Sequence, residues 1–417
     1  GDPARMRDRP RLFVTYSSEM SLLPTWTQKT AALIFLAVLA LIPFGVIPGL
    51  GFLSDNDWMK ILSRVAIFAI GALGLHILSG LAGQVSLGHA FFVAIGAYTA
   101  AVLGGETGTS HWGLGLPIWI WLPAAGAVAA VVGALIAPTA VRVRGIYLAI
   151  VTLGLVFIGE WIFRSLPAMT GGAQAGRKFP GFEVRLWKEE VPLLDPTADG
   201  PWFGVEMTGE AKTYLMLLVL VVIAVIVAKN VQRTRVGRAF MSIRDRDIAA
   251  EVMGVADARY KLMAFALSSA FAGVAGAVLG AFVGRLVPEG FSLLMSVEFV
   301  AILLSGGIGT VTGTLLGAAF VVVLPRLVQD FTGLLASTAE TGDGISASIA
   351  GVFVSTSNTD FGIVSTLPGT SPGLNIAQFN LLLYGLLLIG FLIFEPLGLY
   401  GIWIRIRNYW KSWPFTY

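Results

Sequence analysis

Long apolar runs alternate with shorter polar segments along this chain. A run of about 20 apolar residues is long enough to cross the hydrocarbon core of a membrane as a helix. Ten segments of the sequence approach or exceed that length, so the pattern predicts ten membrane-spanning helices with ends defined to within a few residues. They lie at about 30–50, 59–79, 84–104, 116–140, 145–165, 212–229, 260–284, 292–307, 312–332 and 377–400.

Composition agrees with a membrane protein. The 417 residues are 56% hydrophobic and only 13% charged, with a mean hydropathy of +0.79, which is far from the average of soluble domains. We therefore expect an all-α, polytopic membrane helix bundle with about ten transmembrane helices. The chain has no cysteine, and its three histidines are scattered. This usage argues against disulfides and thiolate sites, and we expect no bound metal.

One polar segment, Lys229 to Lys261, stands between two apolar runs and carries eight basic residues against four acids. Such an excess of Lys and Arg is typical of cytoplasmic loops. Within it, Ile243 to Gly254 predicts a short helix that ends at a glycine. A charged helix held outside the membrane indicates contact with a cytoplasmic partner.

Alternating the ten spans from a cytoplasmic N-terminus places most clusters of basic residues inside. Arg142, Arg144 and the C-terminal Arg405, Arg407 and Lys411 all fall on the cytoplasmic side, whereas Arg177, Lys178, Arg185 and Lys188 fall in an outer loop. The basic stretch from Arg5 to Arg11 is separated from the first apolar run, so we expect no cleavable signal peptide. The predicted organisation is a cytoplasmic N-terminal tail (1–28), a transmembrane domain (29–400) with outer loops 166–211 and 333–376 and a cytoplasmic loop 230–258, and a cytoplasmic C-terminal tail (401–417).

Polar residues interrupt the apolar pattern in a few places that are candidates for a solute path. In SGLAGQVSLGHAFFVAIGAY, glycines loosen the chain around Gln84, Ser86 and His89, and Thr152 lies in a later span. A broken helix can present backbone N–H and C=O groups to a zwitterionic ligand. The alternative is that Gln84 and Ser86 only make hydrogen bonds between helices, and that Thr152 bonds back to its own helix.

Glycines at positions 276, 280 and 284 are spaced four residues apart. This spacing predicts a face of bare backbone on one span, which a neighbouring helix can approach closely. Gly276, Gly280 and Gly284 therefore indicate tight helix packing, with a moving interface as the alternative.

Few acidic residues fall inside the spans. Glu160 and Arg164 are one helical turn apart and able to pair. Glu298 has no such neighbour, so it is either a tether between helices or a proton site.

The chain shows no catalytic motif. It lacks GxSxG and HExxH sequences, and none of its eight lysines follows a glycine, which excludes a P-loop. We expect no enzymatic activity and no cofactor on this chain, and any ATP hydrolysis with its Mg²⁺ must occur on partner chains.

Four ordered segments resemble the membrane permeases of branched-chain amino-acid ABC importers, of the LivM type. They are LSGLAGQVSLGHAFFVAIGAYTA (78–100), RVRGIYLAIVTLGLVFIGEWIF (142–163), GRAFMSIRDRDIAAEVMGVADARYKLMAFALSSAFAGVAGAVLG (237–280) and SVEFVAILLSGGIGTVTGTLLGA (296–318). The stretch LPAMTGGAQAG (166–176) is similar to a Thr-Gly-Gly segment of the family. The longer outer loops and the Glu395–Pro396 pair depart from the family pattern.

The resemblance implies an importer of the bacterial plasma (inner) membrane. Its expected partners are a second homologous permease subunit, two ATP-binding cassette ATPases, an extracytoplasmic solute-binding protein and membrane lipid, with no nucleic acid. Family permeases place a loop with an E-A-A-x-x-x-G-like pattern in a groove of the ATPase. By this resemblance the coupling residues are Arg244, Asp247, Ala249, Ala250, Glu251 and Gly254, with the pattern slightly permuted.

Other functions remain open from the sequence. Within the family, the alternative substrates are urea, short amides and other small solutes. An ion-coupled secondary carrier would use Glu160 or Glu298, and transport would then stop when an uncoupler is added at constant ATP. A channel would require no ATPase partner.

Overall fold

The computed structural model describes residues 26–49, 51–107, 112–143, 145–172, 176–184, 195–202, 204–341, 354–355, 364–365 and 374–412. Most of the expected N-terminal tail, much of both expected outer loops and the end of the C-terminal tail lie outside these residues.

The all-α prediction is confirmed. The main helices are α2 (Trp26–Leu41), α3 (Asn56–Leu75), α4 (His89–Gly104), α5 (Ile118–Arg142), α6 (Ile146–Ser165), α8 (Gly209–Arg233), α9 (Arg235–Val252), α10 (Asp257–Val283), α11 (Leu293–Gly306), α12 (Val311–Thr341), α14 (Ile376–Phe394) and α15 (Gly398–Ser412). Short helical turns are η2 (Ile42–Phe44), η3 (Gly51–Ser54), α7 (Pro167–Thr170) and η5 (Pro288–Phe291), and a π-helix, η4 (His76–Leu81), continues α3.

Strands are short and lie outside the helices. β1 (Arg177–Lys178) pairs antiparallel with β4 (Arg285–Leu286), and β2 (Gly200–Trp202) pairs antiparallel with β3 (Val205–Met207). β5 (Val354–Ser355), β6 (Val364–Ser365) and β7 (Leu374–Asn375) form a small parallel sheet. The β1–β4 pair joins two segments that the sequence places in separate loops.

Each of the ten predicted segments coincides with a described helix, although these helices differ in length. Among the described residues, seven helices are long and apolar enough to span a membrane, and the pair Gln378–Phe394 and Gly398–Tyr409 is bent by 48°. The apolar helices Gln28–Phe44 and His89–Gly104 are shorter. The protein is thus a multi-helix membrane bundle, and the count of ten spans stays a prediction.

Several boundaries differ from the sequence prediction: the span expected at 30–50 ends with α2 at Leu41, and the span expected from residue 84 begins with α4 at His89, because residues 82–88 are not helical. Two further differences lie at the C-terminal spans. The expected last span, 377–400, is broken after Phe394, because Pro396 cannot donate a backbone hydrogen bond to a continuing helix. Helix α12 continues to Thr341 instead of ending at 332, since the polar residues that follow Leu335 are compatible with a helix extending beyond the membrane.

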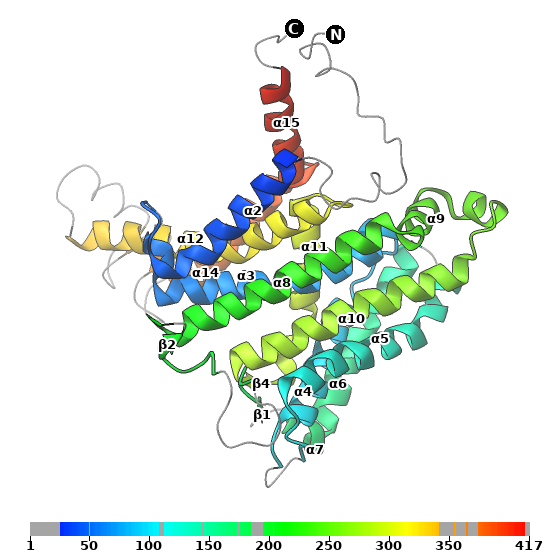
Figure 1. The fold of residues 1–417 in the computed structure, drawn as a ribbon, viewed down its shortest axis with the longest axis horizontal. Coiled ribbons are helices and arrows are strands. Elements are labelled where there is room, and N and C mark those ends of the chain that lie inside the picture. Colours follow the sequence, from blue (N-terminus) through cyan, green and yellow to red (C-terminus); the bar gives the residue numbers. More distant parts are fainter. Residues whose placement is uncertain are drawn as a thin grey trace.

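Helix α10 lies at the centre of the bundle, where it packs against α5, α4 and α3 (Figure 1). α3 packs in turn against α8 and α12. The buried faces of these helices are rich in alanine and glycine, so backbones approach closely, and side chains such as Phe68 and Phe299 fill the remaining core with stacked rings 5.1 Å apart.

The bundle has two distinct ends. α9 lies at one end of α8 and α10, and β1, β4, α7 and β2 lie at the other (Figure 1). We call the α9 end the inner end and the opposite end the outer end, following the predicted topology. Segments that the sequence places on one side of the membrane therefore meet in space.

Candidate functional site

The chain is not helical between the π-helix η4 and α4. This segment, residues 82–88, is called the inner break below. It begins where Ala82 N–H donates to Ile77 O at 3.2 Å, a spacing of five residues, and Gln84 N–H reaches Leu78 O at 3.0 Å. π-Helical turns of this kind are often found at functional sites.

Side chains from two helices bond to the backbone of the inner break and of the first turn of α4. Thr152 Oγ1 on α6 accepts a hydrogen bond from Leu87 N–H at 3.0 Å and donates to Ala149 O at 3.0 Å. Ser296 Oγ on α11 accepts from Ala90 N–H at 3.0 Å. The expected bond of Thr152 to its own helix is confirmed, and the same hydroxyl also holds the break against α6.

Ser86, His89 and Gln84 also bond within this region. Ser86 Oγ accepts from Gly88 N–H at 3.3 Å, and Gln84 Nε2 donates to Ala82 O at 3.2 Å. His89 is buried, with Nε2 2.8 Å from Gly71 O and its ring 4.8 Å from the Phe299 ring. Several backbone N–H groups are therefore already bonded to protein atoms, while Val85 is 49% exposed.

The predicted coupling residues lie on and after α9, which contains a break. Arg246 has extended backbone angles, φ −158° and ψ 100°, so the helix is divided into a near half attached to α8 and a distal half that ends at Val252. The predicted uninterrupted helix from Ile243 to Gly254 is therefore wrong. Asp247 Oδ1 accepts a hydrogen bond from Ile248 N–H at 2.9 Å, directly after the break.

The distal half of α9 is more apolar on its surface than its charges suggest. Ile248, Val252 and Met253 are 67%, 82% and 83% exposed. Ala249, Glu251 and Gly254 are also exposed, whereas Ala250 is buried. Gly254 has φ +89° and ends the helical segment, with its N–H donating to Glu251 O at 2.9 Å.

Arg244 lies on the near side of the α9 break and faces the protein. Its Nη1 donates to Gly80 O at 2.9 Å, which joins α9 to the π-helix that leads into the inner break. Arg244 thus differs in position from the other predicted coupling residues.

The three predicted packing glycines occupy different environments. A Cβ added to Gly276 would lie 1.9 Å from Val93 O, and one added to Gly280 would lie 2.4 Å from the Phe179 ring. Gly284 has φ +74° and follows the last residue of α10, with nothing near its Cβ position. Gly276 therefore meets a helix backbone, Gly280 meets a loop side chain, and Gly284 ends the helix.

The outer end contains the predicted ion pair. Arg164 Nη2 lies 2.7 Å from Glu160 Oε1, which confirms that pairing, and 3.2 Å from Glu289 Oε1 on η5. The contact with Glu289 connects α6 to the segment before α11. Glu298, the other acid that sequence analysis singled out, is half-buried on α11.

Arg177 is buried at the outer end and is not paired with a carboxylate among the described residues. Nη1 donates to Met169 O at 2.6 Å and Nη2 to Trp112 O at 2.9 Å, so the side chain ties α7 to the loop before α5. Burial lowers the pKa of this guanidinium, because the charged form loses hydration. The sequence prediction treated Arg177 only as an outer-loop charge.

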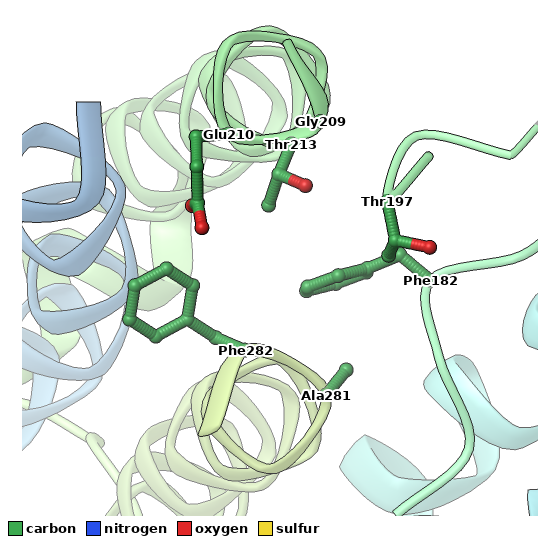
Figure 2. A pocket seen from close by; sticks show the side chains of 7 residues that line it. All are labelled: Phe182, Thr197, Gly209, Glu210, Thr213, Ala281 and Phe282. Atoms are coloured by element: carbon green, nitrogen blue, oxygen red, sulfur yellow. The ribbon is translucent and has the colours of Figure 1, made fainter. Parts of the chain in front are cut away.

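A small cavity of about 100 Å³ lies nearby, between the start of α8 and the end of α10. Figure 2 shows the Phe182 and Phe282 rings on opposite sides of it and the Glu210 side chain directed toward it from α8. Glu210 Oε1 is also 3.7 Å from Lys60 Nζ.

Sequence reasoning missed one buried ion pair. Lys261 Nζ and Asp257 Oδ2 lie 2.7 Å apart at the inner end of α10, and their side chains are 2% and 4% exposed. Both residues were counted among the charges of the cytoplasmic loop. Their separation by four residues is a signal for helical pairing that was available in the sequence.

Comparisons with known proteins show the family of the chain. The family model described as "Branched-chain amino acid transport system / permease component" matches residues 58–392. The high-affinity branched-chain amino acid transport system permease proteins LivM of Salmonella typhimurium and Escherichia coli are each 35% identical over 289 residues, which cover 67% of this chain and 65% of each relative. The chain thus spans slightly less than two thirds of the length of these LivM proteins.

A third relative carries a different name. The autoinducer 2 import system permease protein LsrC of an Enterobacter species is 30% identical over 312 residues, which cover 71% of this chain and 78% of that protein. No solved structure matches the chain. The apolar helices and these relatives identify a multi-pass protein of the bacterial inner membrane. The chain therefore belongs to the family of permease components of branched-chain amino acid transport systems.

Proposed function

We propose that this chain is a transmembrane permease subunit of an ATP-driven importer. With a second homologous permease it forms the path for branched-chain or related neutral amino acids. Two separate ATPases bind to α9 and drive the opening of the path. A solute-binding protein delivers the substrate at the outer end. The chain itself binds no cofactor, and ATP with Mg²⁺ is held by the ATPases.

The observation that carries this proposal is the exposed apolar surface of the distal half of α9. Ile248, Val252 and Met253 lie on a segment that projects beyond the bundle, next to the charged Glu251. Exposed apolar side chains outside the spans favour a protein partner, since water alone does not stabilise them there. The ATPase therefore docks on this distal half, with Ala249, Glu251 and Gly254 at the contact.

The substrate path runs beside the inner break. Gln84 lies on the path, because it is half-buried beside the exposed Val85. Ser86, His89 and Thr152 are buried and bonded within the chain, so they shape the path by holding the break in position. The second permease completes the path from the opposite side.

The substrate class rests on the relatives and on the chemistry of the spans. The two LivM relatives are named for branched-chain amino acids, whereas LsrC is named for autoinducer 2, so the shared scaffold serves more than one solute. A path with few ionisable groups suits a neutral solute with an apolar side chain. Urea, short amides and other small solutes are the alternative substrates.

Reconstitution with the co-purifying chains tests this proposal. The complex isolated from native membranes should contain ATPase and a second permease, and in proteoliposomes should take up labelled leucine, isoleucine or valine only with ATP and the solute-binding protein. Uptake should persist with an uncoupler at constant ATP. Uptake that collapses with the uncoupler supports an ion-coupled carrier, and preference for urea or acetamide reassigns the substrate.

A pair of single substitutions tests the docking surface. Val252→Asp places a charge on the proposed ATPase contact and should reduce ATPase recovery in the purified complex by roughly tenfold, the effect of losing about 1.4 kcal/mol of binding. Val205→Asp is a control, because Val205 is 45% exposed on β3 at the outer end, outside the expected spans and away from α9. Equal ATPase recovery for both variants would contradict docking on α9.

A further inference from the structure

Three segments that are distant in sequence meet at Gly80. Arg244 Nη1 on α9 donates to Gly80 O at 2.9 Å across 164 positions of sequence. A Cβ on Gly80 would lie 2.8 Å from His76 Nδ1 and 3.3 Å from Gly309 N, and a Cβ on Gly309 would lie 3.5 Å from Arg244 Nη1. We call Gly80, Arg244 and Gly309 the inner junction. It joins α9, the end of the π-helix η4 that leads into the inner break, and the turn between α11 and α12.

The guanidinium of Arg244 is held in one orientation. Its Nε and Nη2 each lie 3.1 Å from Asp245 Oδ1, which leaves Nη1 directed at Gly80 O. The aliphatic part of the side chain packs on Gly83, whose Cβ position would be 2.7 Å from Arg244 Cγ. Gly83 also has φ +68°, a conformation that favours glycine. A glycine at this position therefore fits the backbone and leaves room for the Arg244 side chain.

The Gly80 carbonyl needs a donor from outside its helix. The chain leaves the helical path after the π-helix, so the last carbonyls of η4 lack the following turn that would donate to them. A guanidinium supplies a charge-assisted hydrogen bond, which is stronger than a bond between neutral groups. Arg244 therefore stabilises the end of the π-helix at the point where the inner break begins.

The break in α9 explains why this attachment matters. Arg246 separates the near half, which carries Arg244, from the distal half, which carries Ile248 and Val252. The near half is packed on the bundle through buried residues such as Phe240 and Ile243, so any displacement of the distal half that is not taken up by rotation at Arg246 passes to the bundle through the near half. Among the contacts of the near half, the bond from Arg244 to Gly80 O leads directly to the end of the π-helix.

We propose that Arg244 is a positioning residue that transmits movement of the distal half of α9 to the inner break. The near half of α9, the π-helix and the Gly309 turn move as one body, and the inner junction stays formed throughout the cycle. This inference rests on the proposed function and refines it. Arg244 acts inside the permease, whereas the ATPase contacts the residues beyond Arg246.

The first test compares three arginine variants in the reconstituted importer. Arg244→Ala should lower the number of solutes taken up per ATP hydrolysed by about tenfold, while the ATPase still co-purifies. The number of solutes taken up per ATP should be intermediate for Arg244→Lys, because a lysine can donate to Gly80 O but cannot also bind Asp245 Oδ1 through two nitrogens. Arg238→Ala removes an exposed arginine from the same half of α9 and should leave the ratio unchanged.

The second test uses the absence of cysteine in this chain. A Cβ on Gly83 would lie 3.1 Å from Arg244 Cβ, below the 3.5–4.5 Å separation of a disulfide, and Gly83 has a positive φ, so the backbone must shift by a few tenths of an ångström to form the link. The variant Gly83→Cys with Arg244→Cys should transport poorly when reduced and recover when oxidised, because the covalent link replaces the hydrogen bond. If this variant does not fold, the difference between Arg244→Lys and Arg244→Ala decides.

The outcomes separate this inference from the proposed function. A normal uptake-to-ATP ratio in Arg244→Ala, or inhibition by the disulfide, would overturn the inference while the importer assignment stands. Loss of the ATPase from Arg244→Ala would also overturn it, since Arg244 would then be a docking contact. An unmodified chain that binds no ATPase would overturn the proposed function itself.

Discussion

The contact between α10 and α4 is the site where a single added methyl group should have the largest effect. In Gly276→Ala the new Cβ would lie 1.9 Å from Val93 O, 2.7 Å from Val93 C and 3.1 Å from Ala97 N. All three neighbours are backbone atoms of α4, so no side chain can rotate away. The two helices must separate to accept the methyl group.

The size of the effect follows from that geometry. Carbon and oxygen atoms in close packing lie about 3.3 Å apart, so α4 must retreat by more than about 1 Å. Overpacking of this kind costs about 1–3 kcal/mol, and the separation would also loosen the neighbouring contact of Gly96 with Gly273 O. Alanine recovers up to about 1 kcal/mol through its higher helix propensity. The cost lies at the upper end of that range, about 3 kcal/mol, because only backbone atoms can yield, so the net loss is about 2 kcal/mol.

Thermal unfolding of the detergent-purified chain measures this loss. At about 2–4 °C per kcal/mol, Gly276→Ala should lower Tm by roughly 4–8 °C. Gly154→Ala on α6 is the matched control, because nothing lies within 4 Å of its Cβ position, and its Tm should stay the same or rise slightly. Equal Tm values for the two variants would refute the claim that bare backbone at Gly276 sets the helix separation.

Substitutions at three further sites test the buried polar contacts. Asp257→Asn should destabilise the chain by about 3–5 kcal/mol in SDS unfolding, because it leaves the Lys261 charge unpaired. The double variant Asp257→Leu with Lys261→Met should recover most of that loss, and equal stability of the single and double variants would contradict this. Arg177→Met should speed proteolysis of the outer end several-fold, and an unchanged digestion rate would show that its bonds to Met169 O and Trp112 O do not hold that end. Thr152→Val should cost about 1–3 kcal/mol, because Leu87 N–H loses its acceptor, whereas Thr152→Ser should not.

The helices were predictable because the membrane imposes a simple requirement on the sequence. Each span must satisfy its own backbone hydrogen bonds and present apolar side chains, so its signal is local. The expected spans at 116–140 and 145–165 accordingly coincide with α5 and α6. The break at Pro396 departs from this rule because the sequence is apolar before and after the Glu395–Pro396 pair, and a hydropathy average over the whole segment does not register one charge and the loss of one donor.

The site was predictable only in part, because its contacts join distant segments. The polar segment around Gln84 was identified from its composition, but the bond of Leu87 N–H to Thr152 spans 65 positions and that of Arg244 to Gly80 spans 164. No local pattern encodes such pairings. Charge counting also assigned Asp257 and Lys261 to a solvated loop, although burial depends on how α10 packs.

The same contacts limit how this permease can move. Gly96 and Gly276 bring α4 and α10 into backbone contact, and Gly273 does the same between α10 and α5, so sliding one of these helices past another would create clashes. A force applied at α9 must then move α4, α5 and α10 together, or act where packing is less tight. The inner break is not helical, and the Thr152 hydroxyl holds Leu87 N–H to α6, although Gly88 also lies against the α6 backbone, where an added Cβ would be 2.7 Å from Thr152 O. Residues 82–87 can therefore change conformation next to Gly88 without sliding one helix past another, whereas the glycine contacts between α4, α5 and α10 allow only one distance between those helices. We therefore expect the path to open at the inner break while the central helices keep their spacing.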